Sequence, residues 1–147
     1  MLPPLDSDTG NLPPGVHTAS WAEIEAGFGS TPWRRQLLDG LHAALIALQA
    51  AGCRRAYIDG SFVTSKDVPG DFDGCWEAAG VDYDALDPVL LQMRHPRAEQ
   101  KQKYGGELFI ANLPAVPQGT QFLDFFQIDK NTGEAKGIVA IDLGGLT

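Results

Sequence analysis

Several features that define large classes of proteins are scarce or missing in this chain. Its 147 residues include only two cysteines, Cys53 and Cys75, and neither belongs to a paired-cysteine pattern. A disulfide framework and a structural zinc site are therefore not expected, and both thiols should be buried or half-buried. No apolar run is long enough to cross a bilayer, and the N-terminal MLPPLDSDTGNLPPG lacks the features of a signal peptide. We expect a cytoplasmic protein without membrane association.

Basic residues are also few. The chain has 11 Lys and Arg residues against 19 Asp and Glu residues, and its net charge is -8. This balance argues against tight, nonspecific binding to nucleic acid. A nucleic-acid substrate would need either a local contact or a partner protein that supplies the positive charge.

Length and composition indicate one domain. A chain of 147 residues with 44% hydrophobic residues can form a single core and is too short for two ordinary domains. Residues 1–16 contain four prolines and no apolar period, so we expect a flexible lead-in there. Residues 17–147 should then form the folded domain.

Two helices are predicted with clear beginnings. Ser20 and Glu23 fit a capping box that opens SWAEIEAGF. Thr31 and Pro32 fit a cap followed by proline at the first helical position, and they lead into WRRQLLDGLHAALIALQAAG. Leucines recur in this segment at spacings of three and four residues, which predicts an amphipathic helix that ends near Gly52 and packs on a sheet.

The other predicted elements alternate between strands and helices. They are strands over RAYIDGSF, DFDGCWE and ELFIAN, a helix from Asp87 through VLLQM, a helix over RAEQKQKY, and a last strand in KGIVAID after a turn at 131–133. TQFLDFFQI suits a short buried helix, and its aromatic content allows a strand as the alternative. The predicted fold class is therefore α/β (α+β), with a small mixed β-sheet and helices packed on it.

The segment YIDGSFVTSKDVPGDFDGCW, residues 57–76, carries the candidate site. Gly60 lets the chain turn tightly and expose backbone amides to a phosphate, and Ser61 adds a hydroxyl. Alternate residues of a strand point to one face, so Asp71 and Asp73 should converge while Phe72 turns into the core. A tight turn without a ligand and a solvated acidic strand face are the alternatives.

A divalent cation would relieve the repulsion between the two aspartates. Carboxylate oxygens suit Mg²⁺ or Mn²⁺ rather than zinc. Glu107 is the first candidate for a third carboxylate, and Asp142 and Asp124 are weaker candidates. Lys66 could contact a phosphate, although loop lysines are usually only solvated.

Two basic groups are weaker candidates for contacts with a phosphate or an acceptor. One is the run of Arg94, Arg97, Lys101 and Lys103, and the other is the pair Arg34 and Arg35. Exposed helix faces explain both groups more simply.

The stretch GSFVTSKDVPGDFD resembles the signature of the DNA polymerase beta type nucleotidyltransferase superfamily. In that superfamily a Gly-Ser pair precedes an acidic-x-acidic pair on the next strand, and here nine residues separate Ser61 from Asp71. The chain also resembles a group of small bacterial proteins with the same arrangement, through LPPGVHTASWAEI, KYGGELF and KGIVAIDL. Asp59 and Gly74 depart from the superfamily pattern, because apolar residues are usual at both positions.

The resemblance implies a nucleotidyltransferase-like fold and a metal-dependent transfer reaction. Gly60 and Ser61 would hold a nucleoside triphosphate, Asp71 and Asp73 would hold Mg²⁺ or Mn²⁺, and a nucleoside monophosphate would pass to a protein or tRNA acceptor. Small members of the superfamily often act with a cognate partner protein in toxin-antitoxin or defence pairs. The alternative is a catalytically inactive module that binds a nucleotide or a partner. A third interpretation is an α/β protein whose acid pair is incidental.

Overall fold

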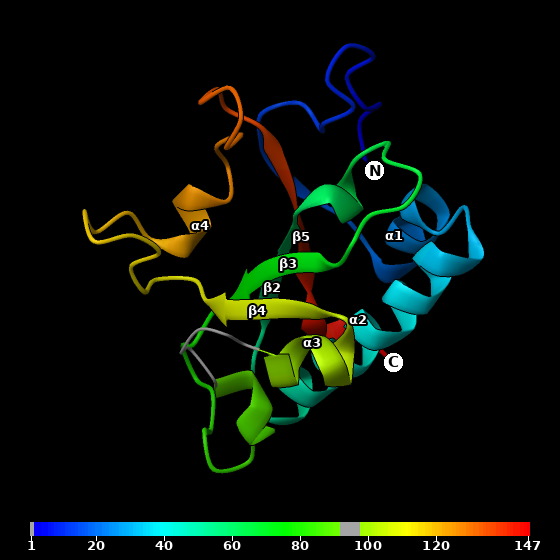
Figure 1. Cartoon of the computed structure of the whole chain (residues 1–147). Coiled ribbons are helices and arrows are strands. Elements are labelled where there is room, and N and C mark those ends of the chain that lie inside the picture. The colour runs from blue at the N-terminus through cyan, green and yellow to red at the C-terminus, as the bar shows by residue number, and fades with distance from the viewer. Residues whose placement is uncertain (1, 92–97) are drawn as a thin grey trace.

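A five-stranded mixed sheet organises the molecule (Figure 1). The structure is a computed structural model that describes residues 2–91 and 98–147. The strands are β1 (Gly15–Thr18), β2 (Arg55–Asp59), β3 (Phe72–Trp76), β4 (Gly106–Ile110) and β5 (Gly137–Asp142), in the spatial order β1-β5-β2-β3-β4. β1 runs parallel to β5 and β3 parallel to β4, whereas β2 is antiparallel to both of its neighbours. With the helices described below, this confirms the predicted small mixed sheet with helices packed on it.

The first two helices begin as the sequence predicts. Helix α1 (Trp21–Phe28) has a complete capping box between Ser20 and Glu23. Helix α2 (Pro32–Ala50) begins after Thr31, whose hydroxyl accepts the Arg34 backbone N–H at 3.1 Å. The leucines of α2 form its buried stripe: Leu37, Leu38, Leu41, Leu45 and Leu48. These leucines bury apolar area against the sheet, which is the main source of stability for such a helix.

Three other segments differ in part from the prediction. Within the described residues the Asp87-Pro88 signal begins a 3-10 helix (Pro88–Leu91), and Gln92 and Met93 of the predicted helix lie outside them. Helix α3 (Ala98–Tyr104) covers most of RAEQKQKY. Helix α4 is a single turn (Phe122–Phe125) and none of its residues is buried, so the expected burial of TQFLDFFQI is wrong for the helix itself. The reason is its position beside a cavity, which leaves its rings half-exposed.

The N-terminal segment is attached to the sheet near the predicted boundary at residue 17. Strand β1 already begins at Gly15 and pairs with β5, so the boundary falls inside a strand. Leu12 is only 2% exposed, and its carbonyl accepts the backbone N–H of Gly137 at 3.0 Å. Pairing with a strand more than a hundred residues away is a nonlocal contact that proline content does not reveal.

The two faces of the sheet pack against different partners. One face contributes Ile58, Phe72, Trp76, Leu108 and Val139 to a large core with helices α1, α2 and α3. The other face contributes Tyr57, Cys75, Phe109, Ile138 and Ala140 to a smaller apolar cluster with Ala111, just after β4, and Phe126 of the α4 segment. In Figure 1, α2 and α4 accordingly lie on opposite sides of the sheet.

Both cysteines are free and buried, as predicted. Burial raises the pKa of the Cys75 thiol to about 12, so this thiol stays protonated at neutral pH. Across residues 2–91 and 98–147, no helix combines the length and apolar character needed to cross a membrane.

Candidate metal and phosphate site

A row of carboxylates crosses three neighbouring strands on the face opposite α2. Asp59 of β2 is the register partner of Asp73 in β3, and Asp73 is the register partner of Glu107 in β4. Register partners on adjacent strands project from the same face of a sheet. The alternation within β3 buries Phe72 completely on the helix side, as the sequence predicts.

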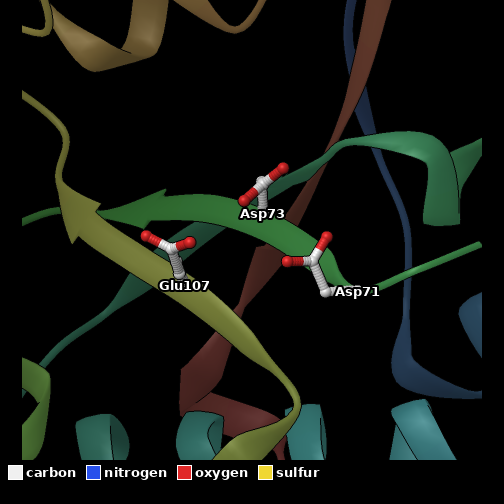
Figure 2. Close-up of side chains that lie close together, drawn as sticks. All are labelled: Asp71, Asp73 and Glu107. Atoms are coloured by element: carbon white, nitrogen blue, oxygen red, sulfur yellow. The ribbon is translucent and has the colours of Figure 1, made fainter. Parts of the chain in front are cut away.

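Asp71 joins this row from the residue just before β3. Carboxylate oxygens of Asp71, Asp73 and Glu107 all lie within 4.8 Å of one another. Figure 2 shows the three side chains pointing to the same side, away from the helix turns at the bottom of the view. The structure therefore brings together all three residues that were predicted as metal ligands.

Clustering and burial disfavour ionisation of Asp73. Burial, followed by the nearby charges of Asp71, Asp59 and Glu107, raises the pKa of the Asp73 carboxyl to about 7. Removal from water disfavours the charged form, and each neighbouring anion adds to the cost. A positive charge placed here would reverse both effects.

Lys101 supplies part of that positive charge from α3. Its Nζ lies 3.1 Å from Asp71 Oδ2 and 3.1 Å from Glu107 Oε1. These two ion pairs raise the pKa of Lys101. The lysine side chain is 52% exposed, and its ammonium sits on a flexible four-carbon stem. The ammonium can therefore move away from the carboxylates at little cost in free energy.

Asp59 is buried next to the cluster and is paired with a second lysine. The residue is 4% exposed, and Lys136 Nζ lies 3.0 Å from its Oδ1. Burial raises the pKa of Asp59, while Lys136 opposes this effect. Asp59 is therefore half of an ion pair at the edge of the site.

Gly60 places the Gly-Ser turn against the acid pair. Its φ of 88° is one that glycine adopts readily, and a Cβ built on it would lie 3.0 Å from Asp73 Oδ2. A 3-10 helix (Ser61–Val63) follows directly. The backbone therefore passes close to the carboxylates without a side chain in between.

Arg34 of α2 holds the loop that follows this turn. The residue is 3% exposed, and its guanidinium donates to the carbonyls of Phe28, Phe62, Thr64 and Lys66. Five donors in a rigid plane allow one arginine to satisfy several carbonyls at once. Arg34 is thus a positioning residue rather than a phosphate contact, whereas the exposed Arg35 donates to the Gly29 carbonyl.

One cavity of about 920 Å³ unites these groups. Its lining includes every predicted site residue: Gly60, Ser61, Lys66, Asp71, Asp73 and Glu107. Lys130 and Lys136 add basic groups to the lining, and phenylalanines from β4 and the α4 segment form another part of it. A volume of this size is typical of small-molecule sites.

The other sequence candidates lie elsewhere. Asp142 pairs with Arg55 at the opposite end of β2, at 3.0 Å, and Asp124 is exposed on α4. Lys103 pairs with Asp87. Arg94 and Arg97 lie outside the described residues.

Gln100 is a supporting residue that the sequence did not single out. It is fully buried on α3, where its side chain accepts the Leu108 backbone N–H at 2.9 Å and donates to the Leu108 carbonyl at 3.2 Å. These bonds tie α3 to strand β4 beside Glu107, and they place the neighbouring Lys101 over the carboxylates. A polar residue between Glu99 and Lys101 on a short helix carries no signal of this role in the sequence.

The donor set fits a hard divalent cation. Three carboxylates offer oxygen ligands only, which suits Mg²⁺ or Mn²⁺ and not a thiolate-preferring metal. Burial and the neighbouring carboxylates raise the pKa of Asp73, and a cation bound by these oxygens would oppose that shift.

Comparison with known proteins gives a family without a described activity. Residues 3–142 match the model of DUF6932, a family of unknown function. The match covers most of the chain, so the chain belongs to that family. No curated protein and no solved structure matches it.

Proposed function

We propose that this protein is a metal-dependent nucleotidyltransferase with a nucleotidyltransferase-like fold. It transfers a nucleoside monophosphate from a nucleoside triphosphate to a hydroxyl group of a protein or RNA acceptor. The observation that carries the proposal is the convergence of Asp71, Asp73 and Glu107 beside the glycine turn at Gly60, in one cavity. The resemblance of GSFVTSKDVPGDFD to the superfamily signature supports the same chemistry.

Asp71, Asp73 and Glu107 would hold Mg²⁺ or Mn²⁺. Such a cation supplies electrostatic stabilisation of a phosphoryl group and orients it for in-line displacement. The protein's own contribution is a rigid arrangement of ligands, because Asp73 and Glu107 sit in register on paired strands. Positioning of this kind supplies a large share of the rate in phosphoryl transfer.

The Gly60-Ser61 turn binds the triphosphate through the Ser61 hydroxyl and backbone amides, and Lys66 lies on the rim of the same cavity. In the reaction, the acceptor hydroxyl oxygen forms a bond to the α-phosphorus. The bond from this phosphorus to the oxygen that bridges to the β-phosphorus breaks, and pyrophosphate leaves with the electron pair. The hydroxyl proton passes to a carboxylate of the cluster.

The acceptor is a protein hydroxyl or an RNA that a partner presents. A net charge of -8 disfavours unaided capture of RNA. We therefore propose a cytoplasmic protein that works with a cognate partner, as in a toxin-antitoxin or defence pair.

Label transfer tests the proposal directly. The protein is incubated with Mg²⁺, candidate acceptors and a triphosphate that is labelled at either the α- or the γ-phosphate. We expect incorporation of the α-label alone, with a loss of about 100-fold or more in Asp71→Asn and Asp73→Asn variants. Asp39→Asn is the matched control, because Asp39 is exposed on α2. Incorporation that is equal in all three variants contradicts the proposal.

An inactive binding module is the second candidate, and Lys101 is the observation that favours it. Its ammonium lies 3.1 Å from both Asp71 and Glu107, so a resident positive charge already neutralises part of the cluster. Calorimetric titration separates the two functions. A binding module takes up a nucleotide without turnover or does not bind Mg²⁺ at all, whereas the transferase binds both and releases pyrophosphate.

A further inference from the structure

Four phenylalanines form a wall of the cavity next to the carboxylates. This phenylalanine wall consists of Phe109 on β4 and Phe122, Phe125 and Phe126 on and after α4. Phe109 and Phe122 stack with ring centroids 4.2 Å apart and planes at 12°. Phe126 contacts all three of the other rings, at 5.8 to 5.9 Å. The rings therefore brace one another into a continuous aromatic surface.

The wall is not merely part of the core. Phe109 and Phe126 are buried, but Phe125 is 39% exposed and no residue of α4 is buried. Single exposed apolar side chains are common, whereas several rings that line one cavity mark a binding surface. In Figure 1 the α4 segment stands off the sheet on the side opposite α2, which is the side of the carboxylates.

The spacing between the wall and the carboxylates is fixed by strand β4. Glu107 and Phe109 are two residues apart, so they project from the same face, about 7 Å apart along the strand. A ligand that contacts both the wall and a cation held by these carboxylates should carry negative charge at one end and a flat apolar group at the other. A nucleotide has this form, since its ribose separates the phosphates from the base.

We propose that the phenylalanine wall binds the nucleobase of the triphosphate by stacking, with little selectivity among the four bases. This inference rests on the proposed function. Every base has a π-face that can stack on a phenyl ring, whereas phenyl rings offer no hydrogen-bond donor or acceptor to read a base edge. Asn11, a polar residue of the same cavity, already donates to Asp129 at 3.1 Å. Purines bind more tightly than pyrimidines because their larger rings stack over more area.

The test compares ligands with and without a base on the full chain with Mg²⁺. The ligands are inorganic tripolyphosphate and the α,β-methylene analogues of ATP, GTP, CTP and UTP, measured by calorimetry. The variants are Phe125→Ala and Phe125→Trp. Leu113→Ala is the matched control, because Leu113 is also 39% exposed but does not line the cavity. Unfolding curves establish that each variant folds.

We expect the analogues to bind about 5- to 150-fold more tightly than tripolyphosphate, which is the range for stacking of one base on an aromatic side chain. Phe125→Ala should remove most of this difference without changing tripolyphosphate binding, and Phe125→Trp should restore it. The four analogues should agree to within about tenfold. Leu113→Ala should match the wild type.

Three outcomes overturn the inference. If tripolyphosphate binds as tightly as the analogues in the wild type, the base has no subsite and the proposed transferase still stands. If one base is preferred by more than about 100-fold, or if Phe125→Ala impairs only transfer to an acceptor, the wall has another role. If no phosphate ligand binds the wild type at all, the proposed function fails as well.

Discussion

The two faces of the sheet differ in what their side chains do, although the same strands build both. On β3, Phe72 and Trp76 enter the helix-covered core, while Asp73 and Cys75 project to the opposite face. On β4, Leu108 faces the core and Glu107 faces the cavity. Because side chains alternate along a strand, the residues that stabilise the fold lie on one face of the sheet and the residues of the candidate site lie on the other.

This separation has an energetic reason. The helix-covered face buries large apolar side chains, which offsets the cost of gathering four carboxylates on the other face. Changes on the helix face should thus reduce stability, whereas changes on the cavity face should alter binding. The predictions below test that division.

The largest expected effect is a loss of stability from the helix face. Leu41 of α2 is fully buried, and Leu41→Ala leaves a cavity in the core. We expect a loss of about 3 kcal/mol in the free energy of unfolding, measured with urea. The exposed Leu113→Ala should cost less than about 0.5 kcal/mol. Similar losses for the two variants would contradict the proposed location of the stabilising core.

Arg34 lies on α2 and donates to carbonyls of the loop that borders the cavity, so its substitution should affect both stability and binding. Arg34→Lys replaces a planar guanidinium, which donates hydrogen bonds to four carbonyls, with a single ammonium. We expect a loss of about 2 to 3 kcal/mol in unfolding free energy because buried carbonyls lose their donors. Tripolyphosphate should also bind more weakly, since the loop after Gly60 loses its support. Arg35→Lys is the control, as Arg35 is exposed.

Much of the helix face could be predicted from the sequence because its signals are local. The caps at Ser20 and Thr31 and the leucine period of α2 depend on residues within a few positions of each other. The alternation around Phe72 was equally local. These patterns sufficed for the mixed sheet with helices packed on it.

The carboxylates of the cavity face could be selected from the sequence, including the distant Glu107, but the contacts that support them could not. Asp71 and Asp73 follow the Gly-Ser turn directly, but the choice of Glu107 over Asp142 and Asp124 depends on strand order and register. Strand β1 and the four carbonyl acceptors of Arg34 depend on contacts across long stretches of chain. The half-exposed rings of α4 were missed because an aromatic pattern normally indicates burial.

Asp73 should make the metal-free protein less stable as pH rises. The pKa of its carboxyl is about 7 in the folded state and 3.8 as its ordinary value. Between these values the folded state retains the proton and the unfolded state does not, so stability falls from about pH 4 to about pH 7. Asp73→Asn should therefore stabilise the metal-free protein by on the order of 2 kcal/mol at pH 8.

Urea unfolding at pH 4 and pH 8 measures this effect. The gain from Asp73→Asn should be present at pH 8 and largely absent at pH 4, and Mg²⁺ should stabilise only the wild type. Asp39→Asn serves as the control because Asp39 is exposed on α2. A destabilising effect of Asp73→Asn at pH 8 would show that the negative charge is already well compensated.

The smallest expected effect is a change in metal affinity, because Lys101 and a metal ion would compete for the same carboxylates. Lys101 must release Asp71 and Glu107 before a cation can use those oxygens, so Lys101→Met should raise Mg²⁺ affinity by about three- to tenfold. Lys103→Met is the control on the same helix, because Lys103 pairs with Asp87. Calorimetry with Mg²⁺ and Mn²⁺ measures the change. Weaker metal binding in Lys101→Met would mean that Lys101 supports the cation site, and the cavity face would then be arranged for a larger anion held jointly by metal and lysine.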